Sequence, residues 1–186
     1  MEESLTIPVI IVLVIRLFFP LTILRWRIAG GIISIIADTL DVFIFDWFGF
    51  PSGGELIESV YHPLDKFLDI YYLTIECVIV YKFWKNPYAR KTGLFLFGFR
   101  MVGFILFEIT GIRQIFFFFP NVFEFFYLEW EIIKKYIPSF SLNSWKTLFL
   151  ILAIVAIPNI IKEYFMHFIE FDTWPFFKRT LFWWMF

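Results

Sequence analysis

The distribution of apolar residues along the chain predicts a helical membrane protein. Long apolar stretches recur, and each is close to the roughly 20 residues that a helix needs to cross a hydrocarbon core of about 30 Å. Polar residues collect in the segments between them. The predicted spans are residues 5–24, 28–48, 67–84, 92–110, 113–130 and 145–162. We therefore expect an all-α fold, a polytopic transmembrane bundle of about six spans.

Two segments depart from a simple spanning helix. The fifth predicted span is short and is interrupted by Pro120-Asn121. Since lipid cannot satisfy backbone groups that a break sets free, this span is expected to lie buried among its neighbours. Residues 163–186 mix Trp, Phe, Lys and Arg, which is typical of an interfacial helix. No repeat or linker divides the chain, so residues 1–186 are predicted to form a single integral membrane domain.

Composition agrees with this class. Of the 186 residues, 60% are hydrophobic, whereas soluble domains are about half apolar. A net charge of −1 provides no basic field for nucleic acid, and the single cysteine, Cys77, excludes an intramolecular disulfide and a multi-cysteine metal site. The N-terminal stretch has an acidic start and no small-residue cleavage site, so we expect a retained anchor. The expected location is the plasma (cell) membrane.

Basic residues predict an orientation. They crowd the first, third and fifth connections between spans. The residues are Arg25, Arg27, Lys82, Lys85, Arg90, Lys91, Lys134, Lys135 and Lys146. By the positive-inside rule, these connections face the inside, and both termini and the second connection face the outside.

Carboxylates interrupt the apolar pattern near the second connection. Asp38 and Asp41 are three residues apart and share one face of the second span. The third span opens with a helical stripe at i, i+4, i+7 and i+11. Its members are Asp65, Asp69, Tyr72 and Glu76. Because the second connection is short, we expect the two acid-bearing helix ends to lie side by side, with their four aspartates close together.

Crowded carboxylates need a counter-charge. Oxygen ligands with excess negative charge suit Mg²⁺ or Mn²⁺, so Asp38, Asp41, Asp65 and Asp69 are predicted to bind a divalent cation. The alternative is structural pairing, for example of Asp38 with Arg16 or Arg100. Acids in the spans outnumber such bases. The acids within the predicted spans are Asp38, Asp41, Asp46, Asp69, Glu76, Glu108 and Glu124. Pairing alone leaves most of them uncompensated, which favours a functional cluster.

The acidic stretches resemble the motif of the CDP-alcohol phosphotransferases. That motif reads Asp-x-x-Asp-Gly-x-x-Ala-Arg, then Gly-x-x-x-Asp-x-x-x-Asp, on the second and third of six transmembrane helices. Here the matching stretches are Asp38-Thr39-Leu40-Asp41 and Asp65-Lys66-Phe67-Leu68-Asp69. Val42 and Tyr61 stand where the family has glycine, no Ala-Arg follows, and the gap between the acid pairs is longer.

The resemblance implies a reaction. In that family the acids hold divalent metal against a CDP pyrophosphate, and the last acid acts as base on the acceptor hydroxyl. This catalytic role would fall on Asp69. A membrane lipid and a nucleotide-linked lipid would then be the substrates, and the chain could act as a monomer or homodimer.

Other polar residues are candidates for substrate contacts or counter-ions. Arg100 and Glu108 share a face of the fourth span, where Gly98 and Gly103 permit close helix approach. Arg100 is either a counter-ion for the acids or a phosphate clamp. Asn121 and Glu124 flank the proline break, which marks either a ligand site or a packed kink. The full set is Arg100, Glu76, Glu108, Asn121 and Glu124.

Three functions fit these features. The first is divalent-metal-dependent phosphotransfer on a lipid or CDP-alcohol at the membrane surface. The second is a small ion- or proton-coupled transporter that uses Asp69, Glu76, Glu108 and Glu124. The third is a non-catalytic subunit of a membrane complex. Acids gathered at one interface favour the enzyme, whereas acids distributed through the bilayer favour transport. The interfacial cluster is denser, and so phosphotransfer is the preferred hypothesis.

Overall fold

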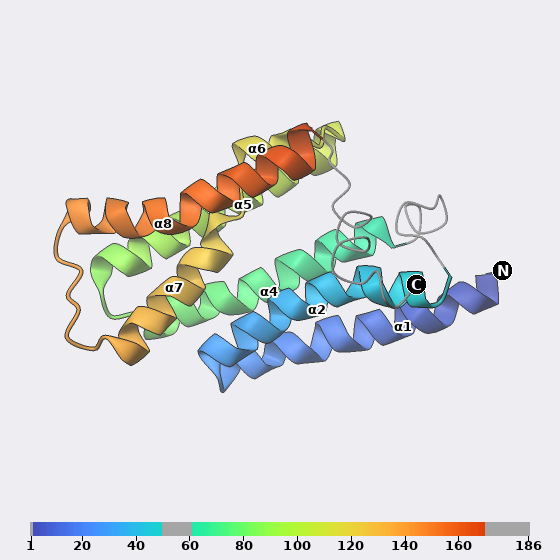
Figure 1. Ribbon diagram of the computed structural model, residues 1–186, viewed down its shortest axis with the longest axis horizontal. Coiled ribbons are helices and arrows are strands. Elements are labelled where there is room, and N and C mark those ends of the chain that lie inside the picture. The colour runs from blue at the N-terminus through green and yellow to red at the C-terminus, as the bar shows by residue number, and fades with distance from the viewer. Residues whose placement is uncertain (1, 50–60, 170–186) are drawn as a thin grey trace, which may run out of the picture.

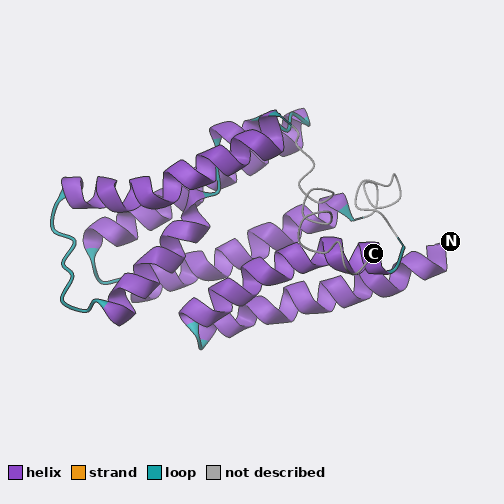
Figure 2. Ribbon diagram, in the orientation of Figure 1, coloured by secondary structure: helices purple, strands orange, loops and turns teal. Residues whose placement is uncertain are grey.

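The described part of the protein is entirely helical. The computed structural model describes residues 2–49 and 61–169, and within these ranges Figure 2 shows helices and loops without a strand. The elements are α1 (Glu2–Phe18), η1 (Phe19–Leu24), α2 (Arg27–Trp47), α4 (His62–Phe83), α5 (Pro87–Thr110), α6 (Ile115–Phe118), α7 (Val122–Tyr136), α8 (Trp145–Glu163) and the π-helical turn η2 (Tyr164–Phe168). The all-α prediction is confirmed for this part of the chain. The predicted interfacial tail lies mostly outside the described residues.

Four helical segments are long and apolar enough to cross a membrane. They are Ile7–Leu24, Arg27–Trp47, Pro87–Thr110 and Trp145–Met166. They correspond to the first, second, fourth and sixth predicted spans. Helix α4 has 22 residues but carries charges along its length. The fifth predicted span is divided into α6 and a 15-residue α7, shorter than a bilayer crossing requires.

The helices form two groups with α7 between them. In Figure 1, α1, α2 and α4 lie side by side, α5 and α8 run together above them, and α7 slants from one group to the other. Helix α7 is largely buried, as expected for the interrupted segment. Its aromatic side chains form the centre of the core, where Tyr127 stacks on Trp84 and Trp130 tilts against the same indole. Exposed Ile, Leu and Phe side chains cover the outer faces of α1, α5 and α8.

Two glycines permit close approaches that fix this arrangement. A β-carbon at Gly30 would overlap the backbone of Thr22 and Ile23, so the turn from η1 into α2 requires glycine there. A β-carbon at Gly103 would overlap the side chain of Phe119. Glycine therefore brings the break before α7 directly against α5, whereas Gly98 has nothing near it.

Candidate functional site

The four predicted aspartates converge on one guanidinium, that of Arg16 in α1. Arg16 Nη2 lies 2.6 Å from Asp38 and 2.5 Å from Asp69, and Nη1 lies 2.9 Å from Asp41 and also pairs with Asp65. Only 3% of the Arg16 side chain is exposed. The ends of α2 and α4 thus lie together as the short connection predicts, at the right of Figure 1. We call Asp38, Asp41, Asp65 and Asp69 the aspartate cluster.

Asp41 and Tyr61 form the buried side of the cluster. The Tyr61 hydroxyl donates to Asp41 Oδ2 at 2.6 Å and accepts from Arg16 Nη1 at 3.1 Å. The other Asp41 oxygen accepts from the backbone N–H of Val42. Burial, and then the negative charge of Asp41, raise the pKa of Tyr61, so its hydroxyl remains a proton donor. Both Asp41 oxygens are therefore engaged within the protein.

The other three aspartates form a group that is open on one side. One carboxylate oxygen from each of Asp38, Asp65 and Asp69 lies within 4.8 Å of the other two. The side chains are 43%, 24% and 19% exposed, in that order. Ligands at about 2.0–2.6 Å around one cation are separated by distances of this size. We call these residues the aspartate triad; Asp41 does not belong to it.

Charge balance leaves the cluster negative. Four carboxylates face the Arg16 guanidinium and the Lys66 ammonium, which lies 3.6 Å from Asp65. When all four are ionised, two negative charges have no counter-charge among the described residues. A divalent cation at the triad would neutralise both. The ion pair between Asp38 and Arg16, the structural alternative that the sequence left open, is present. It does not neutralise all four carboxylates.

Arg16 is the site residue that sequence reasoning undervalued. It is the one charged residue in residues 4–24, an otherwise apolar stretch. A lone charge in such a segment costs several kcal/mol unless it is paired, and therefore marks a candidate site. That signal was available from the sequence, but the apolar pattern does not reveal which way the side chain turns.

Further into the bundle, Glu124 is held by two donors. Tyr72 donates its hydroxyl to Glu124 Oε1 at 2.9 Å, and Asn121 Nδ2 donates to Oε2 at 2.8 Å. Asn121 and Glu124 thus share a face, as their spacing predicts. Tyr72, the third member of the helical stripe on α4, is buried. The stripe therefore extends from the aspartate cluster into the core.

Glu76, the last member of this stripe, is buried without a partner. Its exposed fraction is 0%, and neither carboxyl oxygen has a hydrogen bond with any described residue. The Tyr127 hydroxyl in the same region is also buried and unpaired. An isolated charge is very costly in such a place, so these surroundings favour the neutral acid. Glu76 is therefore a buried group with unused capacity to exchange a proton or bind a cation.

Within the described part of the chain, Arg100 is not a counter-ion for the acids, the first of the two roles expected for it. Arg100 is buried, as expected, but its Nη1 donates to the Phe119 carbonyl at 2.8 Å, and its guanidinium lies over the Phe104 and Phe116 rings. Among the described residues, no acid lies within ion-pair distance of it. The Pro120 break frees this carbonyl, which explains the difference. Glu108 lies exposed near the end of α5.

Comparisons with known proteins give no assignment. No protein-family model, no curated protein and no solved structure matches this chain.

Proposed function

We propose that this protein binds a divalent cation, Mg²⁺ or Mn²⁺, at the aspartate triad and uses it for phosphotransfer on a lipid substrate at the membrane surface. The observation that carries the proposal is the geometry of the triad: three partly exposed carboxylates within 4.8 Å, in a cluster with two unbalanced negative charges. Oxygen ligands and excess negative charge suit these cations. A metal there would neutralise substrate phosphate oxygens.

Within this proposal each residue has a distinct task. Asp38 and Asp65 bind the cation, and Asp69 also accepts the proton of the acceptor hydroxyl. Arg16 holds the carboxylates at a fixed separation, and Asp41 with Tyr61 fixes Arg16 in turn. The motif resemblance suggests a CDP-linked donor: the acceptor oxygen would bond to the phosphorus distal to the nucleoside, the pyrophosphate P–O bond would break, and CMP would leave. Helix α4 and the α6–α7 segment would complete about six crossings of the plasma membrane, in a monomer or homodimer.

The test is CDP-alcohol-dependent transfer to a labelled lipid alcohol in proteoliposomes with Mg²⁺ or Mn²⁺. We expect Asp69→Asn to reduce turnover by a factor of about 10²–10⁴, the scale of general-base removal. Glu108→Gln is the matched control, because it neutralises an exposed acid outside the cluster, and it should retain activity. Absence of metal-dependent turnover in the wild-type protein under these conditions would refute the proposal.

A second function is favoured by Glu76. A carboxyl that is buried at membrane depth without a partner is typical of proton- or ion-coupled transporters. In this case proteoliposomes with a pH-sensitive internal dye should report a proton flux that Glu76→Gln abolishes. Glu108→Gln should leave the flux unchanged, because Glu108 is exposed in the structure and is therefore no longer a candidate for the buried coupling group. A flux of equal size in all three proteins would exclude Glu76 as the coupling group.

A further inference from the structure

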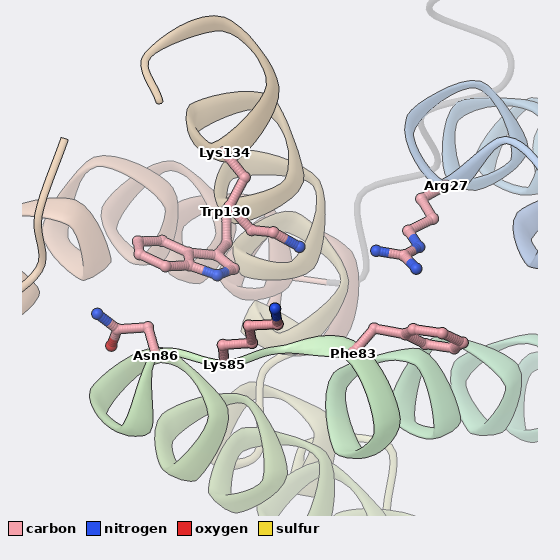
Figure 3. Close-up of a pocket in the computed structure, with 6 residues that line it drawn as sticks. All are labelled: Arg27, Phe83, Lys85, Asn86, Trp130 and Lys134. Atoms are coloured by element: carbon pink, nitrogen blue, oxygen red, sulfur yellow. The ribbon is translucent and has the colours of Figure 1, made fainter. Parts of the chain in front are cut away.

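At the opposite end of the bundle, basic and aromatic side chains surround an open cavity of about 400 Å³. Figure 3 shows its lining, which comes from the start of α2, the end of α4 with the α4–α5 connection, and α7. The lining residues are Arg27, Phe83, Lys85, Asn86, Trp130 and Lys134. We call this the basic pocket. Its volume is in the range of small-ligand sites.

One buried acid organises two of the three cations. Glu131 is buried, and its Oε1 lies 3.0 Å from Lys134 Nζ and 3.9 Å from Arg27 Nη1. The same oxygen accepts a hydrogen bond from Trp84 Nε1 at 2.7 Å. The Arg27 guanidinium also lies 4.3 Å from the centre of the Phe83 ring. These contacts fix both cations at the edge of the cavity.

Lys85 supplies positive charge without a partner. In the described part of the chain no carboxylate lies within 4.0 Å of its ammonium group, whereas Glu131 alone balances Arg27 and Lys134. Figure 3 shows the nitrogen atoms of Lys85, Lys134 and Arg27 turned toward the same space. The pocket therefore has two positive charges in excess, which favours an anionic ligand.

Trp130 adds an unused hydrogen-bond donor. Its side chain is 4% exposed, and its Nε1 has no partner among the described residues. A buried indole N–H usually finds an acceptor, so its lack of one here is consistent with a ligand oxygen as partner. Figure 3 shows this nitrogen on the edge of the ring nearest the Lys85 side chain. The excess positive charge and the free Trp130 N–H both favour a ligand with a negatively charged oxygen group.

The position of the pocket indicates the source of that anion. Segment Ile7–Leu24 ends here, and Arg27–Trp47 begins here. Trp26, next to Arg27 in the sequence, and Phe83, which lines the pocket, are exposed, and Arg25 lies over the Trp26 ring. Exposed aromatics and basic residues at helix ends are typical of the headgroup layer of a membrane. Basic pockets at this depth bind phospholipid headgroups.

We propose that the basic pocket binds the phosphate of an anionic phospholipid headgroup. Lys85, Lys134 and Arg27 supply the charge, Trp130 Nε1 donates a hydrogen bond, and Phe83 packs against the glycerol. The inference is independent of the chemistry at the aspartate triad, because the basic pocket and the triad lie at opposite ends of α2 and α4. Inorganic phosphate shares the chemistry and is the alternative source.

The experiment measures binding of phosphatidylglycerol and phosphatidylcholine to the full chain in detergent by native mass spectrometry. We expect preference for the anionic lipid, about tenfold weaker binding in Lys85→Gln and about fivefold weaker in Trp130→Phe, the scale of single contacts. Lys135→Gln is the matched control, since it removes an exposed charge of α7 outside the pocket, and it should bind within twofold of wild type.

Competition with inorganic phosphate distinguishes the two possible ligands, the phospholipid headgroup and free phosphate. If inorganic phosphate displaces the lipid and shows the same sensitivity to Lys85→Gln, the phosphate site stands and free phosphate is a second ligand. If phosphate does not compete, the ligand is the lipid. Equal losses in Lys85→Gln and Lys135→Gln, or no loss in both Lys85→Gln and Trp130→Phe, would overturn the proposal, because binding would then follow overall charge alone.

Discussion

The two ends of the α2–α4 pair use the same arrangement with opposite signs. At one end a single buried cation, Arg16, is surrounded by four acids. At the other end a single buried acid, Glu131, pairs with Arg27 and Lys134 next to the unpaired Lys85. In each case one buried ion holds groups of the opposite sign at fixed positions. The excess charge then lies on the open side, where a ligand can neutralise it.

The comparison also explains the region between the ends. Arg27 and Asp38 are separated by eleven positions on one helix, or about 16 Å. Two further acids, Glu76 on α4 and Glu124 on α7, are buried in the bundle. Glu124 uses hydroxyl and amide donors, and Glu76 has none. Excess charge on an open side is therefore a feature of the two ends, whereas these two buried carboxyls differ in whether they have hydrogen-bond donors.

The largest expected effect is loss of the buried cation at the acidic end. Arg16→Gln removes the partner of four carboxylates, and breaking such a buried ion pair costs about 3–5 kcal/mol. We expect a corresponding decrease in the free energy of unfolding, measured by denaturant titration in detergent. Added Mn²⁺ should restore part of it. Arg113→Gln, which changes an exposed arginine, serves as the control. Equal stability of the two variants would contradict the role of Arg16 as the buried ion that stabilises the acidic end.

A smaller effect is expected at the basic end. Glu131→Gln retains an oxygen that accepts from Trp84 but loses the ionic contacts to Lys134 and Arg27. Because those two side chains are about one third exposed, we expect a loss of about 1–2 kcal/mol in the free energy of unfolding. The same titration measures it, with Glu108→Gln as control. A loss as large as that of Arg16→Gln would show that the ends are not organised in the way described.

The smallest effect concerns Glu76. If it is a neutral acid in the core, Glu76→Gln preserves its size and charge state, and the free energy of unfolding should change by no more than about 0.5 kcal/mol. A loss above about 2 kcal/mol would mean that Glu76 is ionised and paired, contrary to its unpartnered position. Thermal unfolding in detergent at neutral pH distinguishes these results.

The sequence predicted much of the fold because apolar length and helical period are local properties. The positions of four membrane-length helices and the inward stripe from Asp65 to Glu76 follow from spacing alone. Four of the six predicted spans are confirmed as helices long and apolar enough to cross a membrane. The third corresponds to α4, which has a suitable length but several charges, and Pro120 divides the fifth into two short helices.

The details of the site depend on how helices are rotated, which the apolar pattern does not determine. Helix α1 is apolar on nearly every face, so its rotation is set by the ion pairs of Arg16. Arg100 was expected to meet an acid but meets the Phe119 carbonyl, because Gly103 lets the broken segment approach. The basic pocket joins residues from three distant segments, and no single motif predicts it.

Binding of Mn²⁺ to the purified full chain, followed by electron paramagnetic resonance, tests the central claim most directly. We predict one bound Mn²⁺ per chain, with affinity reduced at least about tenfold in Asp38→Asn and in Asp65→Asn, because each variant removes one charged ligand of the triad. Glu131→Gln, at the basic end, should bind Mn²⁺ like the wild type. No bound Mn²⁺ in the wild-type protein, or equal binding in all of these proteins, would contradict a cation site at the aspartate triad.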